Sequence, residues 1–148
     1  MAKFYLDTGA LVKLYIIEPH SEWVQKQVSR QGLIPLNPLQ LSELTNAILA
    51  AEGRGIISIG AMQKTLRNLD QDIHAGRFAR ETPDWTSVWE QADQLARAHT
   101  QKLLCRTLDI LHVAIARLTA ADLFITGDNR QAALCRKIGL EVREIPEK

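Results

Sequence analysis

The sequence predicts an α/β fold, with a central parallel sheet of about four to five strands flanked by helices on both faces. Two observations lead to this prediction. Short apolar or alternating segments, which are typical of strands, are separated by longer segments whose apolar residues recur at helical spacing. Strands that alternate with helices pair in parallel, because each connecting helix packs back onto the sheet. The length of 148 residues, with 46% apolar and 24% charged content, indicates one folded domain over residues 1–148.

The first predicted strand is the segment KFYL at 3–6, and it runs directly into a carboxylate, Asp7. Thr8 is expected to cap the helix that follows, because its hydroxyl can accept a hydrogen bond from a free amide of the first turn. Pro19 is expected to end that helix. A second helix is predicted over 21–30, and a glycine stops it.

The segment LIPL at 33–36 is a weaker strand candidate. Its proline cannot donate to a sheet ladder, so an edge position is expected. A clear helix start follows, with Asn37 as the N-cap, Pro38 at the first helical position and Gln40 at the third. Apolar residues at helical spacing continue this helix through 41–55.

The second half of the chain repeats the alternation of helices and strands. Gly76 and Pro83 interrupt the helical periodicity across 75–85. The remaining predicted helices are 58–73, 86–98, 107–120 and 129–139, and the remaining predicted strands are 122–126 and 140–145.

Two carboxylates follow predicted strands. Asp7 ends the first strand, and Asp128 follows the strand at 122–126 after one intervening residue. In parallel α/β sheets, ligands bind in the crevice beyond the carboxyl ends of the strands. Each aspartate can equally cap the helix that begins there, since free amides and the helix dipole stabilise a carboxylate. Taken singly, the two residues leave both roles open.

Two further carboxylates, Glu43 and Asp109, lie in apolar helices. A buried carboxylate is costly unless it is paired or bound to a metal ion. Either residue could instead lie on an exposed helix face, or pair with a nearby cation. If all four carboxylates converge on one pocket, a cation is needed among them, because like charges at close range repel. Ligands that are all oxygen favour Mg²⁺ or Mn²⁺ over zinc.

Other potential metal ligands are sparse. Cys105 and Cys135 lie far apart without a CxxC spacing, which favours two free, semi-buried thiols. Among the histidines only His112 lies near the carboxylates, one turn from Asp109, and a structural role inside the fold is expected because zinc requires several ligands. The tryptophans are expected in the core or at an interface: Trp23, Trp85 and Trp89.

Charge and hydropathy favour a cytoplasmic protein without a membrane anchor. No stretch approaches the roughly 20 apolar residues of a membrane span, and the start of the chain lacks the pattern of a signal peptide. The net charge of +1 carries no general nucleic-acid signature, so an RNA or DNA substrate must be argued from a local site.

Four stretches of this sequence together resemble the PIN domain, in particular the VapC-type ribonuclease toxins of toxin–antitoxin pairs. They are YLDTGALVKLY, LSELTNAI, RTLDILHVAIA and FITGDNRQAALCRKIGL. Each motif is short, but their order and spacing extend from the first predicted strand to the last.

The resemblance implies a specific site and activity. The acidic quartet of the family maps onto Asp7, Glu43, Asp109 and Asp128, and Thr126 matches the hydroxyl residue that accompanies the last acid. These residues would hold one or two Mg²⁺ or Mn²⁺ ions and hydrolyse phosphodiester bonds of RNA. The resemblance also implies a homodimer and a cognate antitoxin protein whose tail blocks the site. Basic residues that could contact phosphate, or simply be solvated, are Lys13, Arg106 and Arg130.

Other functions fit less well or differ in biology. A housekeeping RNA-processing nuclease would use the same site, and a neighbouring reading frame for a small antitoxin would distinguish the two. A phosphoacceptor signalling domain would need a second acid beside Asp7 and a lysine in 126–129, and neither is present. A haloacid-type phosphatase would need an aspartate where Gly9 stands. A non-catalytic binding module remains an alternative, because a fold does not guarantee chemistry.

Overall fold

Within residues 1–29 and 32–147, which the computed structural model describes, four strands form the central sheet. Their spatial order is β2 (Gly32–Leu33), β1 (Ala2–Leu6), β5 (Leu123–Thr126) and β6 (Val142–Glu144). All neighbouring pairs are parallel. The predicted α/β class with a parallel sheet is therefore confirmed, and β1 and β5 occupy its centre.

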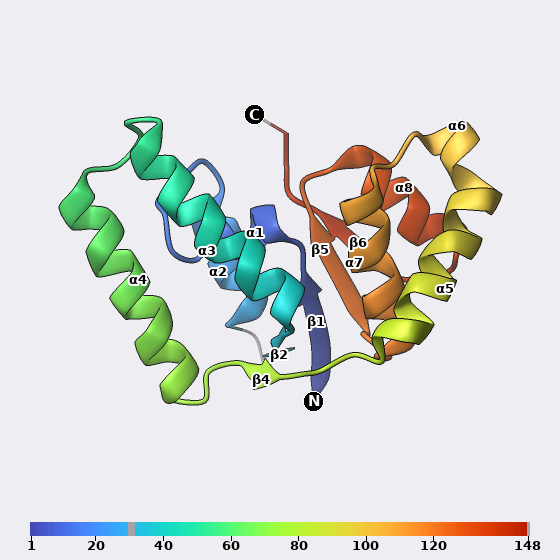
Figure 1. The fold of residues 1–148 in the computed structure, drawn as a ribbon, viewed down its shortest axis with the longest axis horizontal. Coiled ribbons are helices and arrows are strands. Elements are labelled where there is room, and N and C mark those ends of the chain that lie inside the picture. Colours follow the sequence, from blue (N-terminus) through green and yellow to red (C-terminus); the bar gives the residue numbers. More distant parts are fainter. Residues whose placement is uncertain (30–31, 148) are drawn as a thin grey trace.

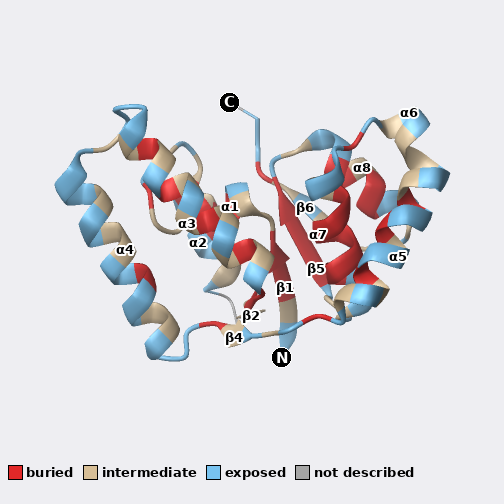
Figure 2. Ribbon diagram, in the orientation of Figure 1, coloured by how far each residue is buried: buried red, intermediate tan, exposed pale blue. Residues whose placement is uncertain are grey.

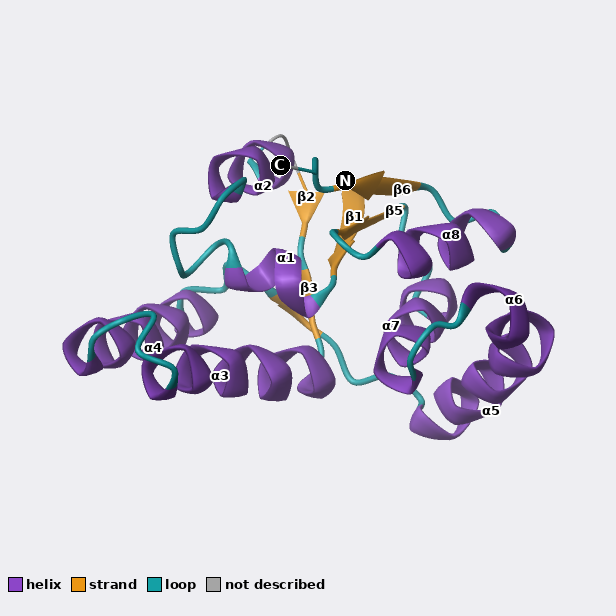
Figure 3. Ribbon diagram, turned by 90° about the horizontal axis from the view of Figure 1, so that it is seen from above, coloured by secondary structure: helices purple, strands orange, loops and turns teal. Residues whose placement is uncertain are grey.

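Helices cover both faces of this sheet (Figures 1 and 3). One side carries α1 (Thr8–Val12), α2 (Ser21–Val28), α3 (Pro38–Gly53) and α4 (Ile59–His74). The other side carries α5 (Trp85–Leu95), α6 (Gln101–Leu103), α7 (Thr107–Leu118) and α8 (Asn129–Lys137). Among the helices that the structure describes, none has the length and apolar character needed to cross a membrane.

The central strands divide their side chains between two cores. Phe4 and Leu6 of β1 pack in the cluster formed with α1 and α3, whereas Tyr5 packs in the cluster formed with α5, α7 and α8. In β5, Ile125 joins the first cluster and Phe124 the second. This alternation follows from the two-residue period of a strand. Figure 2 shows the buried residues concentrated on the strands and on the helix faces that meet them.

The start of α3 is tied to the end of β1. The predicted capping box forms: the Gln40 amide donates to Asn37 Oδ1 at 2.9 Å, and the Asn37 amide donates to Gln40 Oε1 at 3.0 Å. The Gln40 side chain also donates to the carbonyl of Leu6 at 2.8 Å. The first turns of α3, which carry Glu43, are thereby fixed beside the end of β1.

The first helix differs from the prediction at both ends. Asp7, and not Thr8, is the N-cap of α1, because the carboxylate accepts the Ala10 amide while Thr8 already lies in the helix. The helix stops at Val12, well before Pro19. The amides of the next residues bond three positions back, which tightens the last turn and ends the α-helical repeat.

The strand predicted at 33–36 is wrong as a single element. It divides into β2, which holds the predicted edge position, and β3 (Pro35–Leu36), which pairs in parallel with β4 (Ala79–Arg80). Pro35 lacks an N–H group to donate to β1, and the carbonyl of Ile34 accepts the Ala79 amide at 2.8 Å. The segment 75–85, predicted as irregular, therefore contains a short strand.

The remaining elements follow the predicted order with shifted ends. The helix predicted at 86–98 becomes α5 followed by a π-helical turn, Ala96–Thr100, and then α6. Leu104 ends this segment with a left-handed backbone, φ 56°. The predicted end of the second helix, residue 30, lies outside the described residues.

Candidate functional site

The central strands β1 and β5 bring two polar side chains together at their carboxyl ends. The Asp7 amide donates to the carbonyl of Ile125 at 3.1 Å, so the strand ladder continues one residue beyond β1. Thr126 is the last residue of β5 and is fully buried. The crevice beyond these strand ends is where ligands bind in parallel α/β sheets, as the sequence predicts for Asp7 and Asp128.

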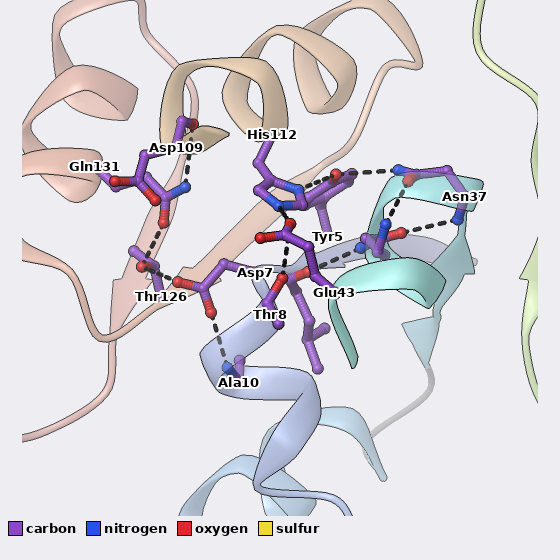
Figure 4. A network of polar contacts seen from close by, with 12 residues as sticks. Tyr5, Asp7, Thr8, Ala10, Asn37, Glu43, Asp109, His112, Thr126 and Gln131 are labelled. Carbon is purple, nitrogen blue, oxygen red and sulfur yellow. Dashed lines mark hydrogen bonds and ion pairs between the residues drawn. The ribbon is translucent and has the colours of Figure 1, made fainter. Parts of the chain in front are cut away.

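Asp7 has a hydrogen-bond partner for each carboxylate oxygen. Its Oδ1 accepts the Ala10 amide at 2.8 Å, and its Oδ2 lies 2.5 Å from the hydroxyl of Thr126 (Figure 4). The helix-capping role considered for this residue is thus real. It does not exclude a role in the site, because capping occupies one oxygen only.

Asp128 also caps a helix with one oxygen. Its Oδ1 accepts the amide of Arg130 at 2.8 Å and that of Gln131 at 3.1 Å, which fixes the start of α8. The Asp128 amide in turn donates to the Thr126 hydroxyl at 3.0 Å. Asp128 and Asp7 are therefore joined through Thr126.

Gln131 is a member of the site that sequence reasoning missed. It is fully buried, its Oε1 lies 2.6 Å from the Thr126 hydroxyl, and its Nε2 donates to the carbonyl of Asp109 at 3.1 Å. Its place three residues after the N-cap Asp128 matches the capping-box spacing, which marks a helix start and gives no sign of burial. Gln131 connects the end of β5 with the first turn of α7.

The contacts of Thr126 favour a protonated Asp7. The hydroxyl has one hydrogen and lies close to two acceptors, Asp7 Oδ2 and Gln131 Oε1. Both contacts are satisfied when Asp7 is protonated and donates to Thr126, which then donates to Gln131. Burial raises the pKa of Asp7, against the lowering effect of its hydrogen bonds, and this agrees with the proton count.

The acids of the site influence one another. Burial first, and the charge of Asp128 second, raise the pKa of Asp109. The charge of Asp109 contributes to the raised pKa of Asp7. Among the described residues, none donates a hydrogen bond to the Asp109 carboxylate, so both of its oxygens are available. Crowded carboxylates of this kind are stabilised by a cation.

Glu43 reaches the site from α3 and is held by two side chains. Thr8 Oγ1 donates to Glu43 Oε1 at 3.0 Å, and His112 Nε2 contacts the same oxygen. Burial acts to raise the pKa of Glu43, but the hydrogen bonds from His112 and Thr8 lower it overall. His112 lies inside the fold, as expected from the sequence, and its partner is a carboxylate of the candidate site.

Two cavities meet at Asp128. The first, about 680 Å³, is lined by Glu43, Asp109 and Asp128 together with Arg106 and Arg130. The structure therefore brings three of the four predicted acids around one cavity, with two cations among them.

The second cavity, about 530 Å³, holds the fourth acid. It contains Asp7 and Asp128 along with Lys13, which also pairs with Glu18 at 2.9 Å. Asp128 is the residue common to both cavities. The four acids thus form an open row and not a closed cage.

The donor chemistry of this row fits a hard divalent cation. Within the described part of the chain, no three His, Cys, Asp or Glu side chains are close enough to form a ready metal cage. Mg²⁺ commonly binds through one or two carboxylates plus water and substrate phosphate, and does not require an all-protein cage. The oxygen donors of Asp7, Asp109, Asp128 and Glu43 match that preference.

Among the residues that were not expected in the site, Cys105 lies beside it, because its thiol donates to the carbonyl of Arg130 at 3.2 Å. Cys105 and Cys135 are both free and buried, which confirms the prediction of free thiols. Burial raises the pKa of the Cys135 thiol to about 12. Trp23 and Trp85 pack at the edges of the two cores, whereas Trp89 on α5 is 57% exposed.

Comparisons with known proteins agree with this architecture. The family model described as PIN domain matches residues 4–137. No relative was found among the curated proteins.

Three solved structures illustrate the likeness of fold. VapBC2 from Rickettsia felis, bound to a DNA fragment from its promoter, shares 14% identity and a TM-score of 0.64, covering 96% of this chain and 98% of that chain. DNA-bound VapBC from Salmonella typhimurium shares 20% identity and a TM-score of 0.63, covering 99% and 100%. A toxin–antitoxin complex from Klebsiella pneumoniae shares 18% identity and a TM-score of 0.60, covering 100% of both chains.

Proposed function

The chain belongs to the PIN domain family, and from this premise we propose that it is a metal-dependent endoribonuclease, the toxin of a toxin–antitoxin pair. The observation that carries the proposal is the row of four carboxylates, from the ends of β1 and β5 and from α3 and α7, that lines two adjoining cavities with cations beside it. We take residues 1–148 to be one nuclease domain that acts in the cytoplasm.

In this proposal Asp7, Asp109 and Asp128 hold one or two Mg²⁺ or Mn²⁺ ions, directly or through water. Glu43 binds a water molecule or shares a second ion. When bound, the ion would supply Lewis-acid chemistry that polarises the phosphodiester and the attacking water. These assignments are supported by the oxygen donors and by the raised pKa of Asp109, to which burial contributes most and the charge of Asp128 second.

The protein side chains would contribute proton transfer and orientation. Asp109 is suited to accept a proton, because its pKa is raised and, within the described part of the chain, its carboxylate has no hydrogen-bond donor. Thr126 orients Asp7 through the 2.5 Å contact and is itself held by Gln131. Catalysis by prepositioned groups requires this second layer of support.

Arg106 and Arg130 are proposed to bind the phosphates of the RNA. Both line the cavity that contains Asp109 and Asp128. The guanidinium of Arg130 lies 3.4 Å from the carbonyl of Leu104, so the arginine is oriented along the rim of this cavity. Arginine presents several donors in a planar fork, which suits phosphate.

The toxin assignment adds two protein partners. The similar solved structures are described as VapBC or toxin–antitoxin complexes, which supports a cognate antitoxin as a partner of this chain. A second copy of the chain is proposed to cover Trp89, whose exposed ring lines a small surface pocket with Ala92 and Ala96. Sedimentation of the wild type and a Trp89→Ser variant tests this dimer.

The nuclease proposal is tested with a mixed RNA pool and matched single-stranded DNA. Purified protein should cleave RNA with Mg²⁺ or Mn²⁺ and not with EDTA, and Asp109→Asn should lose this activity. Asp70→Asn, an exposed aspartate on α4, is the matched control and should cleave as the wild type does. RNA cleavage that persists in EDTA, or in the Asp109→Asn variant, would contradict the proposal.

A further inference from the structure

A series of buried polar side chains, joined by hydrogen bonds, extends from Asn37 to Glu43 (Figure 4). Asn37 precedes α3, Tyr5 lies in the central strand β1, and His112 lies in α7. Their exposed fractions are 1%, 0% and 3%. Buried polar groups are costly unless each is hydrogen-bonded, so the order of donors and acceptors along this series is constrained.

The hydrogen bond between Asn37 and Tyr5 fixes which group donates and which accepts along this series. Asn37 Oδ1 accepts the amide of Gln40 at 2.9 Å, so the oxygen and nitrogen of this side-chain amide are assigned. Asn37 Nδ2 then donates to the hydroxyl of Tyr5 at 3.1 Å. The Tyr5 hydroxyl accepts here and still has one hydrogen to donate.

The next hydrogen bond of the series fixes the tautomer of the histidine. The Tyr5 oxygen lies 2.8 Å from His112 Nδ1, so the hydroxyl donates to this nitrogen. A ring nitrogen that accepts carries no hydrogen, and the hydrogen of the neutral imidazole is therefore on Nε2. His112 Nε2 contacts Glu43 Oε1 and donates to it.

The hydrogen bonds to Glu43 involve only one of its two carboxylate oxygens. Oε1 accepts both from His112 and from Thr8, the latter at 3.0 Å. Oε2 is left as the oxygen available to the cavity that Glu43 lines with Asp109 and Asp128. Two donors on one oxygen hold the carboxylate in a single orientation.

We propose that His112 is a positioning residue for Glu43: backed by Tyr5 and Asn37, it occupies Oε1 and directs Oε2 to the divalent ion or the RNA. This inference rests on the proposed function, and it assigns to His112 a role beyond the structural one expected from the sequence. Partners that hydrogen-bond a ligating carboxylate orient it and tune its basicity.

The tautomer can be measured without any activity. Long-range ¹H–¹⁵N spectra of the histidine-labelled wild type in EDTA should show His112 with its hydrogen on Nε2. Tyr5→Phe removes the donor to Nδ1 and should shift the ¹⁵N signal of Nδ1, while the hydrogen stays on Nε2 because Glu43 still accepts it. The matched control is Tyr15→Phe, which removes a hydroxyl that donates to Asp72 at 2.7 Å, and it should leave the His112 signal unchanged. Hydrogen on Nδ1 of His112 in the wild type would overturn the proposal.

Binding of Mn²⁺, followed by titration calorimetry, tests the consequence for Glu43. His112→Leu should weaken Mn²⁺ binding and slow RNA cleavage by about 10- to 100-fold, the usual effect of losing such a partner. His112→Gln keeps an N–H donor at the position of Nε2 and should restore most of the affinity. His74→Leu, at the exposed end of α4, is the matched control and should bind as the wild type does.

The outcomes separate this proposal from the proposed function. A folded His112→Leu variant with wild-type Mn²⁺ affinity overturns the positioning role, as does equal loss in the leucine and glutamine variants. If the leucine variant does not fold, the tautomer of the wild type and the Nδ1 signal of Tyr5→Phe decide the matter. A wild type that neither binds Mn²⁺ nor cleaves RNA contradicts the nuclease function, whereas the tautomer still reports the hydrogen-bond order.

Discussion

The hydroxyl of Thr126 lies 2.5 Å from the carboxylate of Asp7, although 119 positions separate the two residues in the sequence. The contact exists because β1 and β5 are parallel neighbours in register, with Leu6 opposite Ile125. It places a partly buried carboxyl, whose pKa is raised by burial, at the sheet edge where the other acids gather. Several measurable properties of the protein depend on this arrangement.

The stability of the metal-free protein should fall as pH rises. The pKa of Asp7 is raised by burial, and that of Asp109 is raised by burial and by Asp128. For a carboxyl with a higher pKa in the folded chain, the stabilising effect is full below about pH 4, the ordinary value, and is lost as pH rises through the raised pKa. Glu43, whose pKa is lowered, acts in the opposite direction.

Urea unfolding in EDTA at a series of pH values measures this effect. The free energy of unfolding of the wild type should decrease above about pH 4 relative to that of Asp7→Asn, which has no proton to lose at this position. Asp70→Asn is exposed and should follow the wild type. Parallel curves for the wild type and Asp7→Asn would refute a raised pKa of Asp7 in the folded protein.

Divalent ions should stabilise the folded protein and reverse the fall of its stability with rising pH. A ligand that binds only the folded state adds about 2.7 kcal/mol at a concentration 100 times its Kd. Because the ion binds the ionised carboxylates, the rise in Tm with Mn²⁺ should be larger at pH 8 than at pH 5. Differential scanning fluorimetry of the wild type and Asp128→Asn checks this, and an equal rise in both proteins would argue against Asp128 as a ligand.

Gln131 should matter for both stability and activity. Gln131→Met keeps the size of the side chain but removes the donor to the carbonyl of Asp109 and the acceptor beside the hydroxyl of Thr126. Each such loss costs about 1–3 kcal/mol. The matched control Gln71→Met lies on the exposed face of α4 and should change stability by less than about 0.5 kcal/mol.

Urea unfolding and RNA cleavage should both report the Gln131 change. Cleavage should slow because the carbonyl of Asp109 loses its hydrogen bond to Gln131, which connects it to Thr126 at the end of β5. A Gln131→Met protein as stable and active as the control would show that the bridge through Thr126 is dispensable.

Arg106 and Arg130 should contribute to RNA binding more than to the chemical step. Arg106→Gln and Arg130→Gln should each raise KM with a smaller effect on kcat. For single-stranded nucleic acid, each lost phosphate contact reduces the slope of log K against log salt by about 0.7. Arg117→Gln, at the exposed end of α7, is the control, and salt slopes equal to that of the wild type would remove both arginines from the RNA contact.

Much of the fold is predictable from local sequence. The capping box of Asn37 and Gln40 marks the start of α3 by residue types alone, and the alternation of strands and helices gives the parallel sheet. The division of 33–36 into two strands is not predictable from local sequence, because it depends on the partner strand at Ala79. A proline excludes one pairing without indicating another.

The candidate site, too, is only partly predictable from local sequence. Asp7 and Asp128 are identifiable because strand ends are visible in the sequence, whereas the burial of Gln131 depends on how α8 packs against α7. Likewise, the contact of His112 with Glu43 joins residues 69 positions apart on two different helices. Nothing in the local sequence of either helix specifies that partner.

The most direct test of the proposed nuclease site is RNA cleavage by the Asp7→Asn variant, measured together with the unfolding of that variant. Asparagine caps helices as well as aspartate does and has nearly the same shape, so α1 and the fold should be retained. We predict that the variant unfolds in EDTA at neutral pH with a Tm no lower than that of the wild type and has lost Mg²⁺- or Mn²⁺-dependent cleavage. Cleavage at the wild-type rate by the folded variant would contradict the assignment of the carboxylate row as a nuclease site.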